Sequence, residues 1–128
     1  MTVAEATRLI SLRLAKIDAE SGAHEARILM AYLLGVEVTA LPIHRQMELT
    51  APQLEALTAL VKRREEREPL QYIVGEWAFM GLPMYLEEGV LIPRPETELL
   101  AEHAIRLAKE RGYQTALYLC TGSGCIAV

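Results

Sequence analysis

The residues best suited to chemistry lie in the last dozen positions, where an apolar run enters a glycine loop and resumes directly after it. Gly122, Gly124 and Ala127 fit the pattern G-x-G-x-x-A, in which glycines let the backbone approach a ligand closely. Free N–H groups at a helix start bind a carboxylate or a phosphate. The pattern predicts a buried parallel strand over residues 116–120, a tight turn, and the first turn of a helix.

A second candidate is Arg94, which stands between two prolines. Each proline fixes its own φ and makes the preceding residue extended, so Arg94 has little conformational freedom. Pro95 suits the first turn of a helix, where Glu96 and Glu98 interact favourably with the helix dipole. Two interpretations stay open, a preorganised wall of a binding site and a purely structural turn.

The first 75 residues predict a compact bundle of four or five helices. Two of these helices begin with capping boxes, Thr2 with Glu5 and Thr50 with Gln53. The predicted helices run from Thr2 to about Ala19, from Ala23 to Gly35, over 36–47 with an interruption at Pro42, from Thr50 until Pro69 stops the helix, and as one short turn over 70–75. The stripe Leu54, Leu57, Leu60 and Val61 should be the buried face of the fourth helix.

Charges of both signs are mixed over residues 62–68, at the end of that fourth helix. The simpler interpretation is a solvated helix end held by pairs four residues apart. The alternative is a docking patch for a partner protein.

The hydrophobic period changes at residue 76, where the sequence predicts a β-hairpin over 76–87 with its turn at Gly81–Pro83. Trp77 and Phe79 fall on one face, which we interpret as packing surface. A further helix should follow from Pro95 to about Gly112. Its expected apolar face is Leu100, Ala104, Leu107 and Ala108.

Composition excludes several classes of protein. The 128 residues are 52% hydrophobic and 23% charged, which is typical of a globular chain, and the net charge of −4 gives no general basic surface for nucleic acid. No apolar run approaches the roughly 20 residues of a membrane span, and no signal peptide begins the sequence. Two cysteines and three histidines show no metal-ligand spacing. We expect a reducing, cytoplasmic location.

Four stretches together resemble the PrmC/HemK family of protein-(glutamine-N5) methyltransferases, which act on peptide chain release factors. These stretches are Glu68–Glu76, Phe79–Pro83, Leu91–Glu98 and Thr121–Gly124, and the Ile-Pro-Arg-Pro-Glu-Thr-Glu part is the most specific. The resemblance covers essentially the whole chain.

The resemblance implies a mainly α chain in three parts. Residues 1–75 would be a helical domain that docks the release factor, 76–92 a β-hairpin linker, and 93–128 the start of a Rossmann-like α/β methyltransferase domain. S-adenosylmethionine would be the methyl donor, and the glutamine of a Gly-Gly-Gln motif the acceptor. The implied donor-binding residues are Cys120, Thr121, Gly122, Ser123 and Gly124, with Arg94, Glu96 and Thr97 in the segment that closes over the donor. No membrane or nucleic-acid partner is implied.

Two departures from the family pattern bear on activity. Tyr118 stands where the family strand ends in an acidic residue that helps bind the donor, and Cys120 replaces a frequent glycine. The family's Asn-Pro-Pro-Tyr motif, which holds the substrate glutamine, does not occur in these residues. We therefore expect the chain to be the front part of a larger enzyme, without catalytic residues of its own, inactive alone and a weak binder of the donor.

Three alternatives remain. The glycine pattern also fits a nicotinamide dehydrogenase, although over a hundred residues precede it here. The helical part could instead be a non-catalytic binding module. A methyltransferase of this kind could also act on a different glutamine, such as one in a ribosomal protein.

Overall fold

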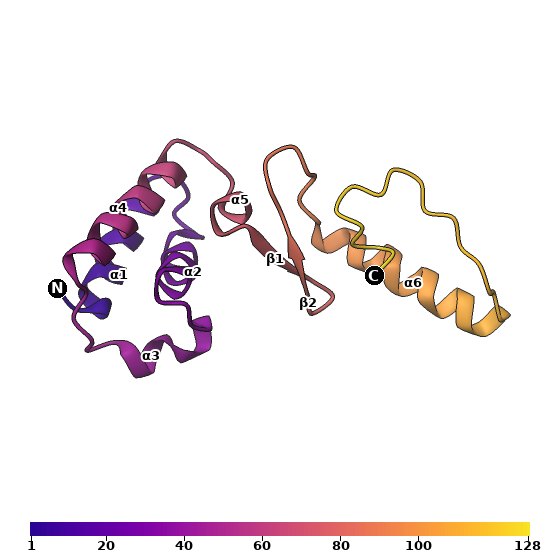
Figure 1. The fold of residues 1–128 in the computed structure, drawn as a ribbon, viewed down its shortest axis with the longest axis horizontal. Helices are drawn as coiled ribbons and strands as arrows, with labels where there is room; N and C mark the ends of the chain where they lie inside the picture. The colour runs from indigo at the N-terminus through magenta and orange to yellow at the C-terminus, as the bar shows by residue number, and fades with distance from the viewer. The chain divides into compact units, whose positions relative to one another are not determined.

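The computed structural model describes all 128 residues and divides them into two compact units, Met1–Val74 and Gly75–Val128. The chain is mainly helical and the second unit adds a two-stranded hairpin, which confirms the predicted fold class (Figure 1). The first unit contains α1 (Val3–Leu14), α2 (Gly22–Leu34), the 3₁₀ turn η1 (Val38–Ala40), α3 (Leu41–His44), α4 (Ala51–Glu65) and α5 (Leu70–Val74). The second contains β1 (Glu76–Phe79), β2 (Leu82–Tyr85) and α6 (Pro95–Arg111).

Helices α1 and α4 begin where their capping boxes predicted. At α1 the Glu5 N–H donates to Thr2 Oγ1 over 3.2 Å, and the Thr2 N–H donates to the Glu5 carboxylate over 2.8 Å. At α4 the same reciprocal pair joins Thr50 and Gln53. Each box satisfies two backbone N–H groups that a helix start would otherwise leave without a partner.

The core of the first unit lies between α1, α2 and α4, which Figure 1 shows grouped together. The most deeply buried large side chains are Leu14, Leu29, Met30 and Val61. On α4 only Leu57 and Val61 of the predicted stripe are fully buried, whereas Leu54 and Leu60 remain half-exposed.

No single helix is long and apolar enough to cross a membrane, although α2 and the η1–α3 segment together reach that length with a 91° bend.

Helix α1 ends five residues earlier than predicted, at Leu14 rather than near Ala19. The side chain of Asp18 explains this, because it accepts the Glu20 N–H over 3.0 Å and the Ser21 hydroxyl over 2.8 Å. These local bonds favour a turn over further helix, and they lower the pKa of Asp18. The turn brings α2 against α1 so closely that a Cβ on Gly22 would lie 2.6 Å from the Ala15 backbone nitrogen.

Two charged side chains at the end of α4 join this helix to its neighbours. Glu65 accepts both Nε and Nη2 of Arg13 from α1, and Arg64 donates to both oxygens of Glu25 from α2. Within the run, Arg63 pairs with the carboxylate of Glu68 five residues away, and Arg64 Nη1 donates to the Glu68 carbonyl. The run is a solvated helix end as predicted, since five of its seven residues are exposed. The predicted ion pairs four residues apart do not form, because the pairs join residues five apart or on neighbouring helices.

Helix α4 also ends before Pro69, the residue predicted to stop it. Arg67 takes the left-handed conformation (φ 71°), and the Glu68 N–H returns to the Arg63 carbonyl. This is the arrangement in which helices commonly close on a glycine, here built on an arginine.

The segment after η1 returns to the start of α1. The N–H groups of Val3 and Ala4 donate to the carbonyls of Met47 and Arg45, over 2.9 and 3.0 Å. Pro42 does not interrupt a helix as predicted, because it lies in the first turn of α3, where no N–H is needed.

The hairpin forms where predicted, with Glu76 opposite Tyr85 and Phe79 opposite Leu82. Its turn is Met80–Gly81, with φ of 49° and 77°, and not Gly81–Pro83. Two left-handed residues give the turn twist that suits a two-residue hairpin loop. Leu82 and Pro83 consequently belong to β2.

In the second unit, the buried face of α6 differs from the predicted one. On α6 the fully buried residue is Ala101, whereas Leu100 and Ala104 are exposed and Leu107 and Ala108 are half-buried. Phe79 and Met84 of the hairpin share a small core with Ala101, so the hairpin decides which face of α6 is covered.

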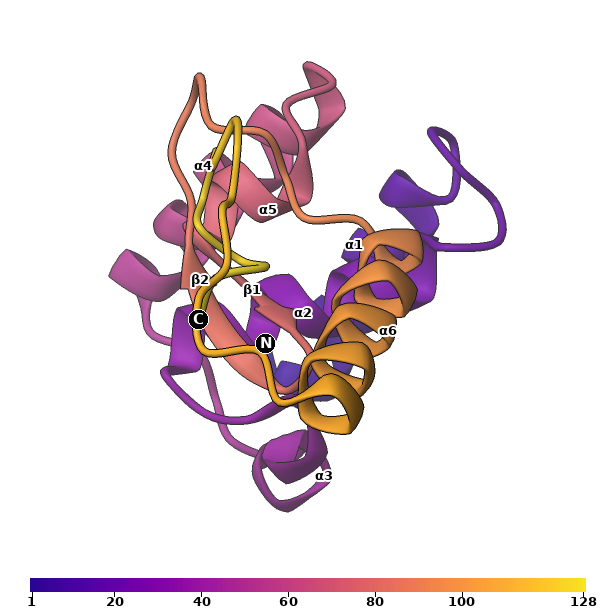
Figure 2. The same ribbon diagram turned by 90° about the vertical axis from the view of Figure 1, so that its right-hand side faces the viewer.

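Residues 113–128 form no strand and no helix, so the predicted strand over 116–120 and the helix after Gly124 were wrong for this structure. A parallel strand requires a hydrogen-bonded neighbour, and the two-stranded hairpin supplies none to this segment. The coil instead turns back along α6 (Figure 1), and Figure 2 shows it in yellow from the side. Cys125 and Ile126 pack on the small core, while Leu117 is 85% exposed.

Candidate functional site

The segment before α6 holds Arg94 as predicted, in an extended conformation with φ −103° and ψ 148°. Arg94 is the residue that caps α6 at its N-terminal end, and Pro95 occupies the first helical position. The Thr97 N–H donates to the Arg94 carbonyl over 3.1 Å, so the backbone on both sides of the arginine is constrained.

The two acids that follow have different roles. Glu98 accepts the backbone N–H of Met80 over 2.8 Å and thereby joins the start of α6 to the hairpin turn. The sequence predicted only that Glu98 interacts with the helix dipole, because no local pattern reveals a partner 18 residues away. Glu96 is exposed and forms no hydrogen bond or ion pair in the structure.

The glycine loop closes through turns that require left-handed backbone. Cys120, Gly122 and Gly124 have φ of 56°, 53° and 77°. The Gly124 N–H donates to the Thr121 carbonyl over 2.8 Å, and the Ala127 N–H donates to the Gly124 carbonyl over 3.1 Å. The loop therefore folds without the flanking strand and helix.

These two segments meet around one cavity of about 370 Å³. Six of the eight predicted donor-binding residues line it, and Glu96 and Gly124 do not. The six are Arg94, Thr97, Cys120, Thr121, Gly122 and Ser123, and the rest of the lining is Leu91, Ile92, Pro93, Leu100, Tyr118, Leu119, Cys125 and Ile126.

The chemistry of this lining is one cation, several hydroxyls and an apolar wall, with no carboxylate. Arg94 can bind a carboxylate or a phosphate, and the hydroxyls of Thr97, Thr121 and Ser123 can donate to one. Partial burial raises the pKa of Tyr118, and its contact with the Cys125 thiol adds to this, so the phenol stays a neutral hydrogen-bond donor.

The same lining offers no anion to a bound ammonium group. No group of three or more histidine, cysteine or acidic side chains is arranged to hold a metal ion. The cavity is therefore suited to the anionic end of a small ligand.

Comparison with known proteins places the chain in a family. The PrmC N-terminal domain family matches residues 5–75, which is more than half of the chain. The chain belongs to the PrmC family. This confirms the relationship that the four sequence stretches indicated.

Full-length relatives of the PrmC family extend the match beyond the helical unit. Proteins named release factor glutamine methyltransferase from Chlorobaculum tepidum and Corynebacterium glutamicum are 41% and 37% identical to this chain, over 108 and 128 residues. These alignments cover 80% and 99% of this chain, but 37% and 44% of the relatives. The chain spans about two fifths of the length of the curated relatives it matches.

Proposed function

We propose that the protein of which these 128 residues are part transfers a methyl group from S-adenosylmethionine to the side-chain amide nitrogen, N5, of a glutamine. The substrate is the Gly-Gly-Gln motif of peptide chain release factors. Support comes from the family match and from relatives, named for this activity, that align with up to 99% of the chain.

Within this proposal the two units have separate roles. The helical unit docks the release factor, and residues 93–128 begin the methyltransferase domain. The observation that carries the second assignment is the cavity that brings Arg94 and Thr97 together with Cys120–Ser123.

The cavity fits one part of the donor. Arg94 and the hydroxyls of Thr97 and Thr121 would hold the methionine carboxylate, whereas the lining has no acid for the ammonium group or for the ribose hydroxyls. The donor would supply an electrophilic methyl on a sulfonium. Tyr118, which stands in place of the acid, can donate one hydrogen bond but cannot pair with a cation.

Positioning is the main demand of this reaction. An amide nitrogen is a poor nucleophile because its lone pair is delocalised into the carbonyl. Holding two reacting groups in line can supply roughly 7–11 kcal/mol of the barrier. The 128 residues contain no Asn-Pro-Pro-Tyr motif to hold the glutamine, so we propose that they dock substrate without transferring methyl groups.

The activity is tested with the complete protein, a bacterial release factor and S-adenosylmethionine. Mass spectrometry should find one added methyl on the Gly-Gly-Gln peptide, and none on a release factor whose glutamine is replaced by alanine. Methylation of another protein's glutamine, with the release factor unmodified, would overturn the proposal.

The role of Arg94 is tested in the same assay. Arg94→Ala should raise the KM for S-adenosylmethionine roughly tenfold, the equivalent of one charge-assisted hydrogen bond. Arg106→Ala is the matched control, since Arg106 is exposed on α6 and contacts only His103. Equal effects of the two substitutions would remove Arg94 from the donor site.

The 128-residue chain provides a separate test. Titration with S-adenosylmethionine should give no binding heat at micromolar concentrations, because the cavity has no acid for the donor's ammonium group or ribose hydroxyls. Clear micromolar binding would contradict this part of the proposal.

A further inference from the structure

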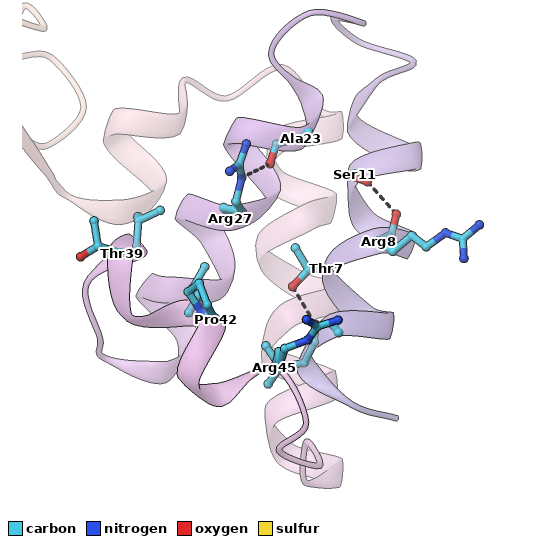
Figure 3. A pocket seen from close by; sticks show the side chains of 12 residues that line it. Thr7, Arg8, Ser11, Ala23, Arg27, Thr39, Pro42 and Arg45 are labelled. Atoms are coloured by element: carbon cyan, nitrogen blue, oxygen red, sulfur yellow. Dashed lines mark hydrogen bonds between the residues drawn. The ribbon is translucent and has the colours of Figure 1, made fainter.

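A groove of about 670 Å³ crosses the helical unit between α1, α2 and the η1–α3 segment. Figure 3 shows the side chains that line it, with Thr7, Arg8 and Ser11 from α1 and Ala23 and Arg27 from α2. The other lining residues are Val3, Ala4, Val38, Thr39, Leu41, Pro42 and Arg45. None of these residues lines the cavity near Arg94.

The charges on this groove are all of one sign. Three arginines line it, Arg8, Arg27 and Arg45, and no aspartate or glutamate does. None of the three forms an ion pair, in contrast to Arg13, Arg63 and Arg64 of the same unit, each of which has a glutamate partner. Arg67, the remaining arginine without a carboxylate partner, does not line the groove. Three of the four arginines of this unit that have no carboxylate partner thus line one groove, although the chain carries a net charge of −4.

The floor of the groove is apolar and contains no aromatic ring. Val3 and Leu41 are buried beneath it, and Val38 is half-buried. Single-stranded nucleic acid is usually bound by basic grooves that carry aromatic rings for base stacking. A floor of small aliphatic side chains under a basic rim instead suits a peptide with apolar residues on one side and carboxylates on the other.

One backbone hydrogen bond joins two walls of the groove, and side-chain hydrogen bonds within α1 and α2 order residues that line it. The Ala4 N–H donates to the Arg45 carbonyl over 3.0 Å, and the Thr7 hydroxyl donates to the Val3 carbonyl over 2.7 Å. On the α2 wall Arg27 Nε donates to the Ala23 carbonyl over 3.3 Å, as Figure 3 shows. A surface that is already ordered loses less conformational entropy on binding.

We propose that this groove docks an acidic, amphipathic segment of the release factor, whose carboxylates pair with Arg8, Arg27 and Arg45. The inference rests on the proposed function, because it names the surface by which the helical unit recognises its substrate. Apolar side chains of the segment cover Val3, Val38 and Leu41.

The test measures binding of the 128-residue chain to an intact bacterial release factor. The triple variant Arg8→Glu, Arg27→Glu, Arg45→Glu should raise Kd at least roughly tenfold and reverse the dependence of Kd on salt. Arg67→Glu is the matched control and should leave Kd within about twofold, because an exposed charge outside an interface has a small effect on affinity. All four arginines are exposed, so far-UV circular dichroism should show an unchanged fold.

A second pair of variants tests the same surface without changing charge. Ala23→Trp places an indole in the groove and should block docking, whereas Ala59→Trp changes an exposed alanine of α4 that lies outside it. This pair also decides the matter if the triple variant fails to fold.

The possible failures are distinct. Release factor that binds all variants equally overturns the groove and leaves the proposed function standing. Release factor that does not bind the unaltered chain overturns the groove and the docking role of the helical unit, whereas the methyl transfer is decided by the assay with the complete protein. Binding of transfer RNA, or self-association, that the same arginine substitutions abolish would assign the groove to a different occupant and overturn this inference.

Discussion

The two units of this chain differ in how they are stabilised. Fourteen of the eighteen buried apolar side chains lie in Met1–Val74, and only four lie in Gly75–Val128. All four ion pairs also belong to the helical unit. The helical unit therefore has a core and charged contacts of its own, whereas the unit that carries the candidate donor site depends on local turns and a few hydrogen bonds.

This difference in stability bears on which function each unit can support. A docking surface can be built on the helical unit because its shape is fixed by packing among α1, α2 and α4. The donor-site residues lie over a core of three residues, Phe79, Met84 and Ala101, so their positions rest on the proline-bounded Arg94 and on left-handed turns.

The largest loss of stability should come from truncating a buried side chain in the core of the helical unit. Leu29 is fully buried, and Leu29→Ala should lower the free energy of unfolding by about 2–5 kcal/mol. Thermal melting followed by circular dichroism measures this. Phe79→Ala should leave the main helical transition in place and change only the fluorescence of Trp77, the single tryptophan. One shared transition for both variants would show that the units do not differ in this way.

A smaller loss should follow from crowding the contact between α1 and α2. Gly22→Ala places a methyl group 2.6 Å from the Ala15 backbone nitrogen and should cost about 1–3 kcal/mol. The reference is His24→Ala, which alters an exposed neighbour on the same helix. Chemical denaturation of the two variants gives the comparison, and equal midpoints would contradict the close approach of the helices.

Acid should weaken the helical unit through its ion pairs. The hydrogen bond from Arg13 lowers the pKa of Glu65 below its ordinary value of 4.5, and that from Arg63 does the same for Glu68. Because the folded pKa is depressed, this stability is fully present above pH 4.5 and is lost as pH falls through the folded pKa.

The pH effect is measured by melting the chain at a series of pH values below 6, a limit of about one and a half units above the ordinary glutamate pKa. Arg13→Gln should flatten part of the acid dependence, because the charge that depresses the pKa of Glu65 is gone. An unchanged profile in that variant would show that the pair contributes nothing measurable, as many exposed pairs do.

The smallest effect belongs to the second unit. Glu98→Ala removes the acceptor of the Met80 N–H and should cost about 1 kcal/mol or less. Amide exchange at Met80 should accelerate while exchange in α1 and α2 stays the same. Glu98→Gln, which keeps a side-chain oxygen, is the control and should preserve most of the protection.

Local signals predicted much of the fold. The pairs Thr2–Glu5 and Thr50–Gln53 marked helix starts, Gly35 and Gly112 marked helix ends, and the hairpin was found from its alternating pattern. Six of the eight proposed donor-binding residues share a cavity, although the strand and helix expected around the loop are absent. The sequence did not predict the basic groove because its arginines are far apart in the chain, and only the packing of α1, α2 and α3 brings them together.

Capping boxes, glycine ends and proline-bounded residues could be found in the printed sequence because their hydrogen bonds and φ restrictions close within a few residues. The tertiary structure alone chose Ala101 rather than Leu100 as the buried face of α6, and paired Arg64 with a glutamate 39 positions away. Burial and ion pairing depend on which residues from distant parts of the chain pack against a given side chain. The free energy of such contacts therefore cannot be inferred from the neighbouring residues in the sequence.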